Sequence, residues 1–279
     1  MDKLNRKISI SKAIITFLFL FVSLTGLFPF IFMLSSSLKN AADVFAYPFQ
    51  LISDPLVLTN YPELFSPNYY FVRWYTNTIV MVAVTLAFRM VVVGITAYSL
   101  SKLRYKGRDT LFLLFMVTLM IPGDQLLVPR YIVLSILKLT DTMWSMVFLY
   151  TFEFFLVFLV RQSYLSIPDE LSEAAIIDGC SHFRVYFNII LPLSKPVMVT
   201  MAIFTFVWQW NDFTNPFIFI NDSTKTMISV GISKFATEHT VNYALQMAGA
   251  SLTLLPVIIV YLFTQRYFIQ GVATSGIKG

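Results

Sequence analysis

The sequence predicts an all-α integral membrane protein with six transmembrane helices and a long cytoplasmic loop between the fourth and fifth. The composition is the first observation: 57% of the 279 residues are hydrophobic and only 13% are charged, whereas soluble domains carry about 25% charged residues. The second is the abundance of large apolar side chains, with 28 Phe, 14 Tyr and 4 Trp, which argues against disorder. The third is a series of six apolar runs. A water-soluble globule is therefore excluded.

Each of the six runs is bounded by charged or turn-forming residues. A helix needs about 20 apolar residues to cross the hydrocarbon layer. The third run is the least sharply bounded, because Pro122, Gly123 and Asp124 interrupt it. The predicted spans are 13–34, 77–100, 110–121 with a weak continuation to 128, 142–160, 197–220 and 243–268.

The first run has two interpretations. Signal peptides contain an apolar segment of about 7–15 residues, and residues 13–34 form a longer run without charge. We therefore expect a retained helix, with a cleaved signal peptide as the alternative.

The distribution of Lys and Arg predicts the orientation. If the N-terminus is cytoplasmic, 13 of the 20 Lys and Arg residues fall in cytoplasmic segments and 6 outside, and Arg89 lies within the second span. This bias places both termini in the cytoplasm. The expected segments are a cytoplasmic N-terminus (1–12), the first span (13–34), an extracellular loop (35–76), a five-helix core (77–268) that includes the cytoplasmic loop 161–196, and a cytoplasmic tail (269–279).

Within the cytoplasmic loop the sequence predicts a short helix. Ser166 followed three residues later by Asp169 is a capping-box variant, and Pro168 is tolerated in a first helical turn. One apolar face is expected, formed at helical spacing by Leu171, Ala174, Ala175 and Ile177.

A second short helix is expected to follow a sharp turn. Gly179 suits the left-handed conformation that ends a helix, and Ser181 suits the cap of the next one. Pro192 and Pro196 are expected to close this second helix.

The charges on this loop favour a protein partner over a lipid surface. Helices that lie on anionic membranes carry Lys and Arg on their polar face. The first helix instead carries carboxylates that an anionic leaflet repels: Asp169, Glu170, Glu173 and Asp178.

These residues resemble a known family. The spacing Glu-Ala-Ala, three residues, Gly, nine residues, Ile-x-Leu-Pro is similar to the "EAA" loop of ABC importer membrane subunits, and the fuller match resembles carbohydrate permeases of the maltose type. Cys180 departs from the pattern, where the family usually has Ala, and we expect it to pack as a small hydrophobe. The matching residues, spread over about 77–279, are Glu173-Ala174-Ala175, Asp178-Gly179, Ile189, Leu191-Pro192, Pro196, Ile167-Pro168, Phe204, Trp210-Asn211-Asp212, Gln265 to Phe268, Gly276 to Gly279, Asn77-Thr78, Ala97-Tyr98 and Lys106-Gly107-Arg108.

The resemblance implies a binding-protein-dependent sugar importer in a bacterial cell membrane. Its implied partners are a second, related permease subunit, two copies of an ATPase and an extracellular solute-binding protein. ATP and Mg would be bound by the ATPase, because this chain has no Gly-x-x-x-x-Gly-Lys-Ser/Thr motif. The residues implied to dock on the ATPase are Glu173, Ala174, Ala175, Asp178 and Gly179.

Polar residues within the spans suggest a substrate pathway. The cluster Trp208, Gln209, Trp210, Asn211 and Asp212 combines aromatic rings with groups that bind hydroxyls, as a sugar site requires. Packing between helices is the alternative interpretation.

A charged residue in a span requires a partner. Arg89 and Glu153 are expected at similar depths, so we hypothesise an ion pair between them, or else an Arg89 that meets an anionic substrate.

Other functional classes are less well supported. An ion-coupled secondary carrier would need an internal repeat, and none is evident. An ABC importer of glycerol phosphate remains an alternative to a sugar importer. One Cys and two His do not make a metal site, and no catalytic arrangement is expected. The Lys and Arg residues lie in short clusters between apolar runs, which favours binding to the lipid bilayer over binding to nucleic acid.

Overall fold

The computed structural model describes residues 10–48, 50–52, 54–236 and 242–275. Parts of the predicted cytoplasmic N-terminus and tail lie outside these residues. All the described elements are helices, as predicted. The contacts divide the chain into two units, residues 1–69 with 232–254, and residues 70–231 with 255–279.

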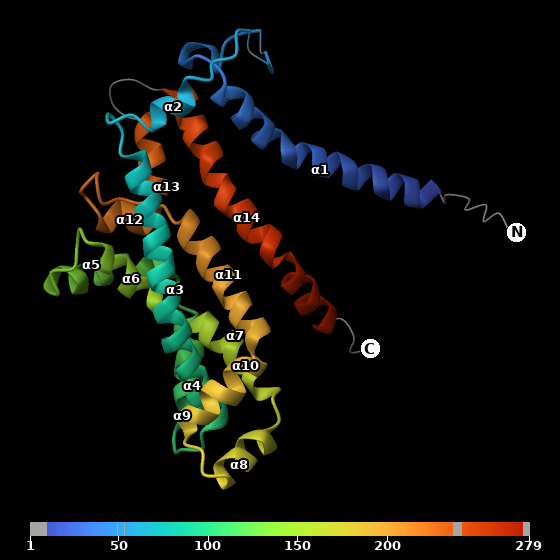
Figure 1. Cartoon of the computed structure of the whole chain (residues 1–279), viewed down its shortest axis with the longest axis vertical. Helices are drawn as coiled ribbons and strands as arrows, with labels where there is room; N and C mark the ends of the chain where they lie inside the picture. The colour runs from blue at the N-terminus through green and yellow to red at the C-terminus, as the bar shows by residue number, and fades with distance from the viewer. Residues whose placement is uncertain (1–9, 49, 53, 237–241, 276–279) are drawn as a thin grey trace, which may run out of the picture. The chain divides into compact units, whose positions relative to one another are not determined.

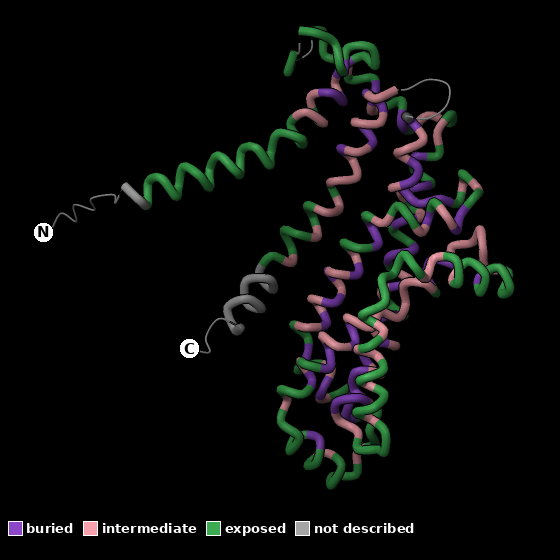
Figure 2. Tube along the Cα trace, turned by 180° about the vertical axis from the view of Figure 1, so that it is seen from behind, coloured by how far each residue is buried: buried purple, intermediate pink, exposed green. Residues whose placement is uncertain are grey.

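The first unit contains α1, three short helices and the start of α14 (Figure 1). Asn60 joins its segments, because the Asn60 side-chain amide donates to the carbonyl oxygens of Ser37 (2.9 Å) and Lys39 (2.8 Å). Most of α1 is exposed within the unit (Figure 2), although it is apolar on all faces. Such a surface suits lipid or another membrane helix. The elements are α1 (Ile10–Ser37), η1 (Ala41–Asp43), α2 (Asn60–Leu64), η4 (Lys234–Ala236) and α14 (Tyr243–Ser275).

The second unit is built around α3 (Phe71–Lys102), which packs against α6, α7 and α11. Its buried cluster includes Val93, Ala97 and Tyr98 of α3, Tyr164 of α7 and Met201 of α11. α8 and α9 lie at the end of the unit where α3 ends, and α13 lies toward the other end (Figure 1). The remaining elements are α4 (Arg108–Thr118), η2 (Gly123–Leu126), α5 (Leu127–Ile136), α6 (Met143–Thr151), α7 (Phe154–Leu165), α8 (Asp169–Ile177), α9 (His182–Val185), η3 (Tyr186–Ile190), α10 (Leu191–Leu193), α11 (Lys195–Asn211), α12 (Thr214–Phe219) and α13 (Ile228–Ser233).

In the described residues, three helices are long and apolar enough to cross a membrane, or up to six if each of three bent helix pairs counts as one span. The predictions for α1, α3 and α14 correspond to single helices. The third and fourth predicted spans instead contain bends, of 97° between α4 and the segment 123–136 and of 42° between α6 and α7. The prediction of a continuous fifth span over 197–220 is wrong, because Asp212 adopts an extended conformation after α11 (φ −69°, ψ 121°).

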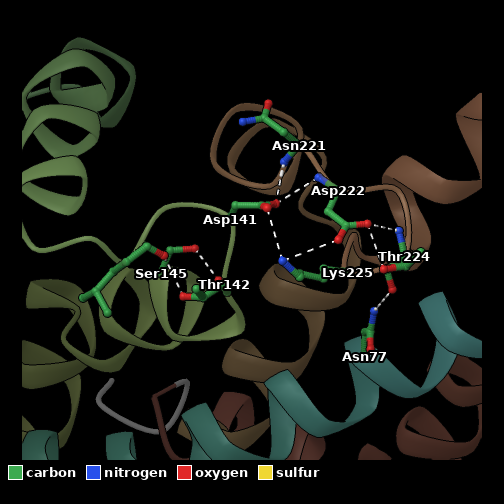
Figure 3. A network of polar contacts seen from close by, with 9 residues as sticks. Asn77, Asp141, Thr142, Ser145, Asn221, Asp222, Thr224 and Lys225 are labelled. Atoms are coloured by element: carbon green, nitrogen blue, oxygen red, sulfur yellow. Dashed lines mark hydrogen bonds and ion pairs between the residues drawn. The ribbon is translucent and has the colours of Figure 1, made fainter.

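A polar network joins the loop before α6 to the loop after α12 (Figure 3). The carboxylate of Asp141 accepts a hydrogen bond from the backbone N–H of Asp222 (2.9 Å) and pairs with the ammonium of Lys225 (3.2 Å). Lys225 also pairs with Asp222 (3.4 Å), and the side chain of Asn77 in α3 donates to the carbonyl of Thr224 (3.0 Å). These contacts fix both loops against α3.

We expect replacement of Asp141 by Asn to weaken this network in a pH-dependent way. The N–H of Asp222 and then the hydrogen bond from Lys225 hold the pKa of Asp141 below its usual range. The carboxylate therefore stabilises the fold above the unfolded pKa of about 4, and this stabilisation is lost as the pH falls through the lower folded pKa. Because the pair is partly exposed, we expect the melting temperature of Asp141→Asn to be lower by only about 1–2 °C at pH 7.

Asn is a suitable replacement because it tolerates the positive φ of 59° at position 141. Thermal unfolding of the purified protein from pH 3 to 8 measures the effect. A difference between the two proteins that stays constant down to pH 3 would show that the charge of Asp141 is not what stabilises the network.

Candidate functional site

The helix predicted after Ser166 is present, but Ser166 does not cap it. α8 begins at Asp169 with Pro168 as its N-cap residue. The hydroxyl of Ser166 donates instead to the carbonyl of Ser163 (2.7 Å), because Ser166 is the C-cap residue of α7. The capping-box prediction is therefore wrong, since α7 continues to Leu165 and leaves only a short connection to α8.

The turn after α8 is confirmed. Gly179 has a φ of +86°, and the backbone N–H of Cys180 donates to the carbonyl of Ala175 (2.9 Å), which closes the helix in the manner expected for a left-handed C-terminal residue. The hydroxyl of Ser181 accepts from the N–H of Arg184 (3.4 Å) and so caps α9, as predicted. We call residues 169–185 the α8–α9 hairpin.

The second helix ends at Leu193, between Pro192 and Pro196, as predicted. The helix continues from α9 through a π-helical turn, η3, into α10, and Pro192 lies in the first turn of α10. The chain bends by 79° between the segment 182–193 and α11, at Ser194. Pro196 occupies the first turn of α11, where a missing N–H costs no helical hydrogen bond.

Two ion pairs join α8 to the last residue of α3 and to the segment that follows it. The ammonium of Lys102 donates to the carboxylate of Asp169 (2.6 Å) and to the carbonyl of Ile167 (2.5 Å). The Lys102 side chain is only 3% exposed, and this hydrogen bond lowers the pKa of Asp169. The second pair, between Arg104 and Glu173 (3.3 Å), is exposed on both sides. A cavity of about 450 Å³ lies beside these pairs, between α8 and the end of α3.

The residues of the EAA-type motif face different surroundings. Ala175 and Cys180 are partly buried against the core cluster of the second unit, which agrees with a packing role for Cys180. Ala174, Asp178 and Gly179 are exposed.

The apolar face predicted for α8 is not a buried face. Ile177 is 84% exposed and Leu171 is 44% exposed, and Phe183 of α9 is 68% exposed. Phe183 was not predicted as a functional residue, because an apolar pattern does not separate an exposed Phe from a packed one. Lys102 was not predicted either, because its partners lie more than sixty positions away in the sequence.

A second cavity, of about 160 Å³, is lined by polar residues at the breaks between helices. Three members of the predicted pathway cluster line it: Trp208, Gln209 and Asp212. The other two do not line this cavity. Trp210 is buried with its ring stacked on Phe206 (5.3 Å between centroids), and Asn211 is exposed.

Arg89 and Glu153 line this same cavity but do not form the ion pair that we hypothesised. The guanidinium of Arg89 donates to the hydroxyl of Thr205 (3.0 Å) and to the backbone carbonyl of Tyr150. In the described part of the chain, no carboxylate lies within 4.0 Å of a nitrogen of Arg89. The break before α7 explains this, because it gives Glu153 an extended backbone (φ −139°, ψ 117°) in place of the helical position assumed in the prediction.

The described residues contain no group of three or more His, Cys, Asp or Glu side chains placed to hold a metal ion. In the described part of the chain, neither cavity therefore has the ligands of a metal centre.

Comparison with known proteins places these features in a family. Residues 69–274 match the family described as binding-protein-dependent transport system inner membrane component. The chain is 32% identical, over 283 residues, to the probable ABC transporter permease protein YurM of Bacillus subtilis (strain 168), with all of this chain and 92% of that protein covered. It is 30% identical to the arabinooligosaccharides transport system permease protein AraQ of Halalkalibacterium halodurans, over 99% of this chain and 100% of the relative.

The fold is also similar to that of a solved transporter. The match is to a chain in the crystal structure of a bacterial ABC transporter involved in the import of the acidic polysaccharide alginate, with a TM-score of 0.84 and 23% identity, over 96% of this chain and 100% of that one. Dependence on a binding protein excludes an ion-coupled carrier that works alone. The chain thus belongs to the family of binding-protein-dependent transport system inner membrane components, and it is a multi-pass, non-catalytic permease subunit of an ABC importer.

Proposed function

We propose that this chain forms half of a sugar translocation pathway and that its α8–α9 hairpin docks on a separate ATPase subunit. The observation that carries the proposal is the exposure of apolar side chains, Ile177 at 84% and Phe183 at 68%, on a hairpin that ion pairs hold against α3. The carboxylates beside these side chains disfavour burial in an anionic lipid surface. A protein groove is the better match, with Glu173, Ala174, Ala175, Asp178 and Gly179 as the docking segment.

The packing of the second unit supplies the path of the coupling. Lys102 joins α8 to α3, and α3 packs against α6, α7 and α11. ATP-dependent closure of the ATPase pair displaces the hairpin, and the helices rock together, so that the pathway opens toward the binding protein. Hydrolysis of ATP, with its Mg held in the ATPase, resets the cycle. This chain supplies no cofactor.

The names of the relatives support the proposed substrate and partners, and the distribution of Lys and Arg supports the proposed orientation. AraQ is named for arabinooligosaccharides, and we assign a sugar to this chain in preference to glycerol phosphate. A second permease subunit completes the pathway, and a solute-binding protein docks on the outer face, which includes the loop 35–76. Both termini lie in the cytoplasm, with the first span at 13–34, the core at 77–268 including the loop 161–196, and the tail at 269–279.

Reconstitution tests the proposed function. The complete transporter, with its permease partner, ATPase and the binding protein encoded beside it, is placed in proteoliposomes. ATP-dependent uptake of arabinotriose, maltotriose, an alginate trisaccharide and glycerol 3-phosphate is then measured. We expect uptake of a saccharide that is lost when only the catalytic glutamate of the ATPase is replaced by Gln. Uptake of glycerol 3-phosphate alone, or uptake of a saccharide without a working ATPase, would contradict the proposal.

A further inference from the structure

We infer that the cavity around Gln209 is a binding subsite for one unit of an uncharged saccharide, so that this subunit contacts the transported solute directly. The inference rests on the proposed function and adds a location and a substrate class. α6 ends before Phe152 and Glu153, and α11 ends before Asp212, with extended backbone at each break. Glu153 and Asp212 both line the cavity.

Breaks of this kind have a restricted place in membrane proteins. Backbone without helical hydrogen bonds is tolerated at membrane depth only where it is buried in protein or lines a polar cavity. In transporters, interrupted helices also mark the position where substrates bind. Two such interruptions meet at this cavity, and the side chains at both are polar.

An unpaired polar side chain provides a second, independent indication. Gln209 is only 2% exposed, and neither its amide nitrogen nor its amide oxygen has a hydrogen-bond partner within the described structure. Nε of Arg89 and Oδ1 of Asn215 are also buried and without a partner there, and all three residues line the cavity. Buried amides are nearly always hydrogen-bonded, so these atoms indicate a ligand that both donates and accepts hydrogen bonds.

The charges of the lining residues define the class of ligand. Arg89 and Arg130 are balanced by Glu153 and Asp212, which gives the cavity no formal net charge. An anionic solute would lie against two carboxylates, and a cationic one against two guanidinium groups. Hydroxyl groups, in contrast, donate to carboxylates and accept from guanidinium and amide groups. The ring of Trp208 adds an apolar surface for the C–H face of a sugar.

The replacement Gln209→Leu tests the subsite in the reconstituted transporter, with the panel of solutes given above. Leu removes the two unpaired polar atoms at similar volume, so the fold is expected to be at least as stable. We expect the uptake rate of a neutral trisaccharide, measured with saturating binding protein, to fall at least about tenfold. ATP hydrolysis stimulated by the binding protein should stay within about twofold of the wild type. The matched control is Gln162→Leu, an exposed position in α7 outside the cavity.

A second variant, Glu153→Gln, tests the argument from charge. The side chain of Glu153 makes no capping hydrogen bond to α7, so the replacement leaves the start of that helix intact. We expect uptake of the neutral trisaccharide to fall and the ratio of acidic to neutral uptake to rise, because the cavity becomes positively charged.

The outcomes separate this inference from the proposed function. Unchanged uptake in both variants, or a wild type that imports only the alginate trisaccharide, would overturn the uncharged-saccharide subsite and leave the sugar importer standing. A Gln209→Leu transporter with a lowered melting temperature would instead show that Gln209 has a structural role, and would also overturn the subsite. A wild type that imports no saccharide would overturn both.

Discussion

Replacement of Gly179 by Val is expected to reduce solute uptake at least about tenfold while the chain still inserts into the membrane. Gly179 has a φ of +86°, and a Cβ at this position would meet no atom within 4 Å. The only cost is therefore conformational, about 1–2 kcal/mol for an L-residue in the left-handed region and more for a β-branched one. This cost falls on the turn that holds α8 against α9, so the docking surface becomes misplaced. Uptake and ATP hydrolysis stimulated by the binding protein are measured together.

Gly26→Val is the matched control for this variant. Gly26 also has open space around its Cβ position, but it lies within α1 and does not have a positive φ. We expect wild-type activity from the control. Equal activity of Gly179→Val and the wild type would show that transport does not depend on the shape of the hairpin.

Replacement of Lys102 by Ala is expected to uncouple ATP hydrolysis from transport more strongly than replacement of Arg104 by Ala. The side chain of Lys102 is almost completely buried. It makes charge-assisted hydrogen bonds to Asp169, the first residue of the hairpin, and to the carbonyl of Ile167 just before it. Removing them costs about 1–2 kcal/mol of local stability, since Asp169 is exposed enough to be rehydrated. The exposed pair of Arg104 with Glu173 is worth about 0–1 kcal/mol.

The measured quantity is the number of solute molecules imported per ATP hydrolysed. We expect this ratio to fall about tenfold in Lys102→Ala and less than twofold in Arg104→Ala. Lys102 is the last residue of α3 and Arg104 lies two residues beyond it, so each variant controls for the loss of a positive charge there. Similar ratios in both variants would contradict the proposal that the pair of Lys102 with Asp169 transmits the motion.

The sequence predicted the elements that depend on local chemistry. Gly179 and Ser181 are where they were expected, since a left-handed turn and a helix cap are set by the residues themselves. The apolar runs of α1, α3 and α14 likewise predicted uninterrupted helices. Each of these features can be predicted from its own residues, without the contacts that the rest of the chain makes.

The features that depend on contacts between distant segments were not predictable in this way. The breaks before Glu153 and at Asp212 fall within apolar runs whose composition fits a continuous helix. The partners of Arg89 follow from the first of these breaks, because it moves Glu153 away from the helical register and presents the carbonyl of Tyr150 instead. Lys102 bonds to residues more than sixty positions away, so its role appears only after α3 and α8 are placed together.

Site-specific photocross-linking tests the central claim most directly. A benzoylphenylalanine introduced at Ile177, which is 84% exposed, is irradiated in the assembled transporter in its membrane. The expected result is a covalent adduct with the ATPase subunit, whose yield changes when ATP is added. An adduct with lipid alone, or none with the ATPase in any nucleotide state, would contradict the account.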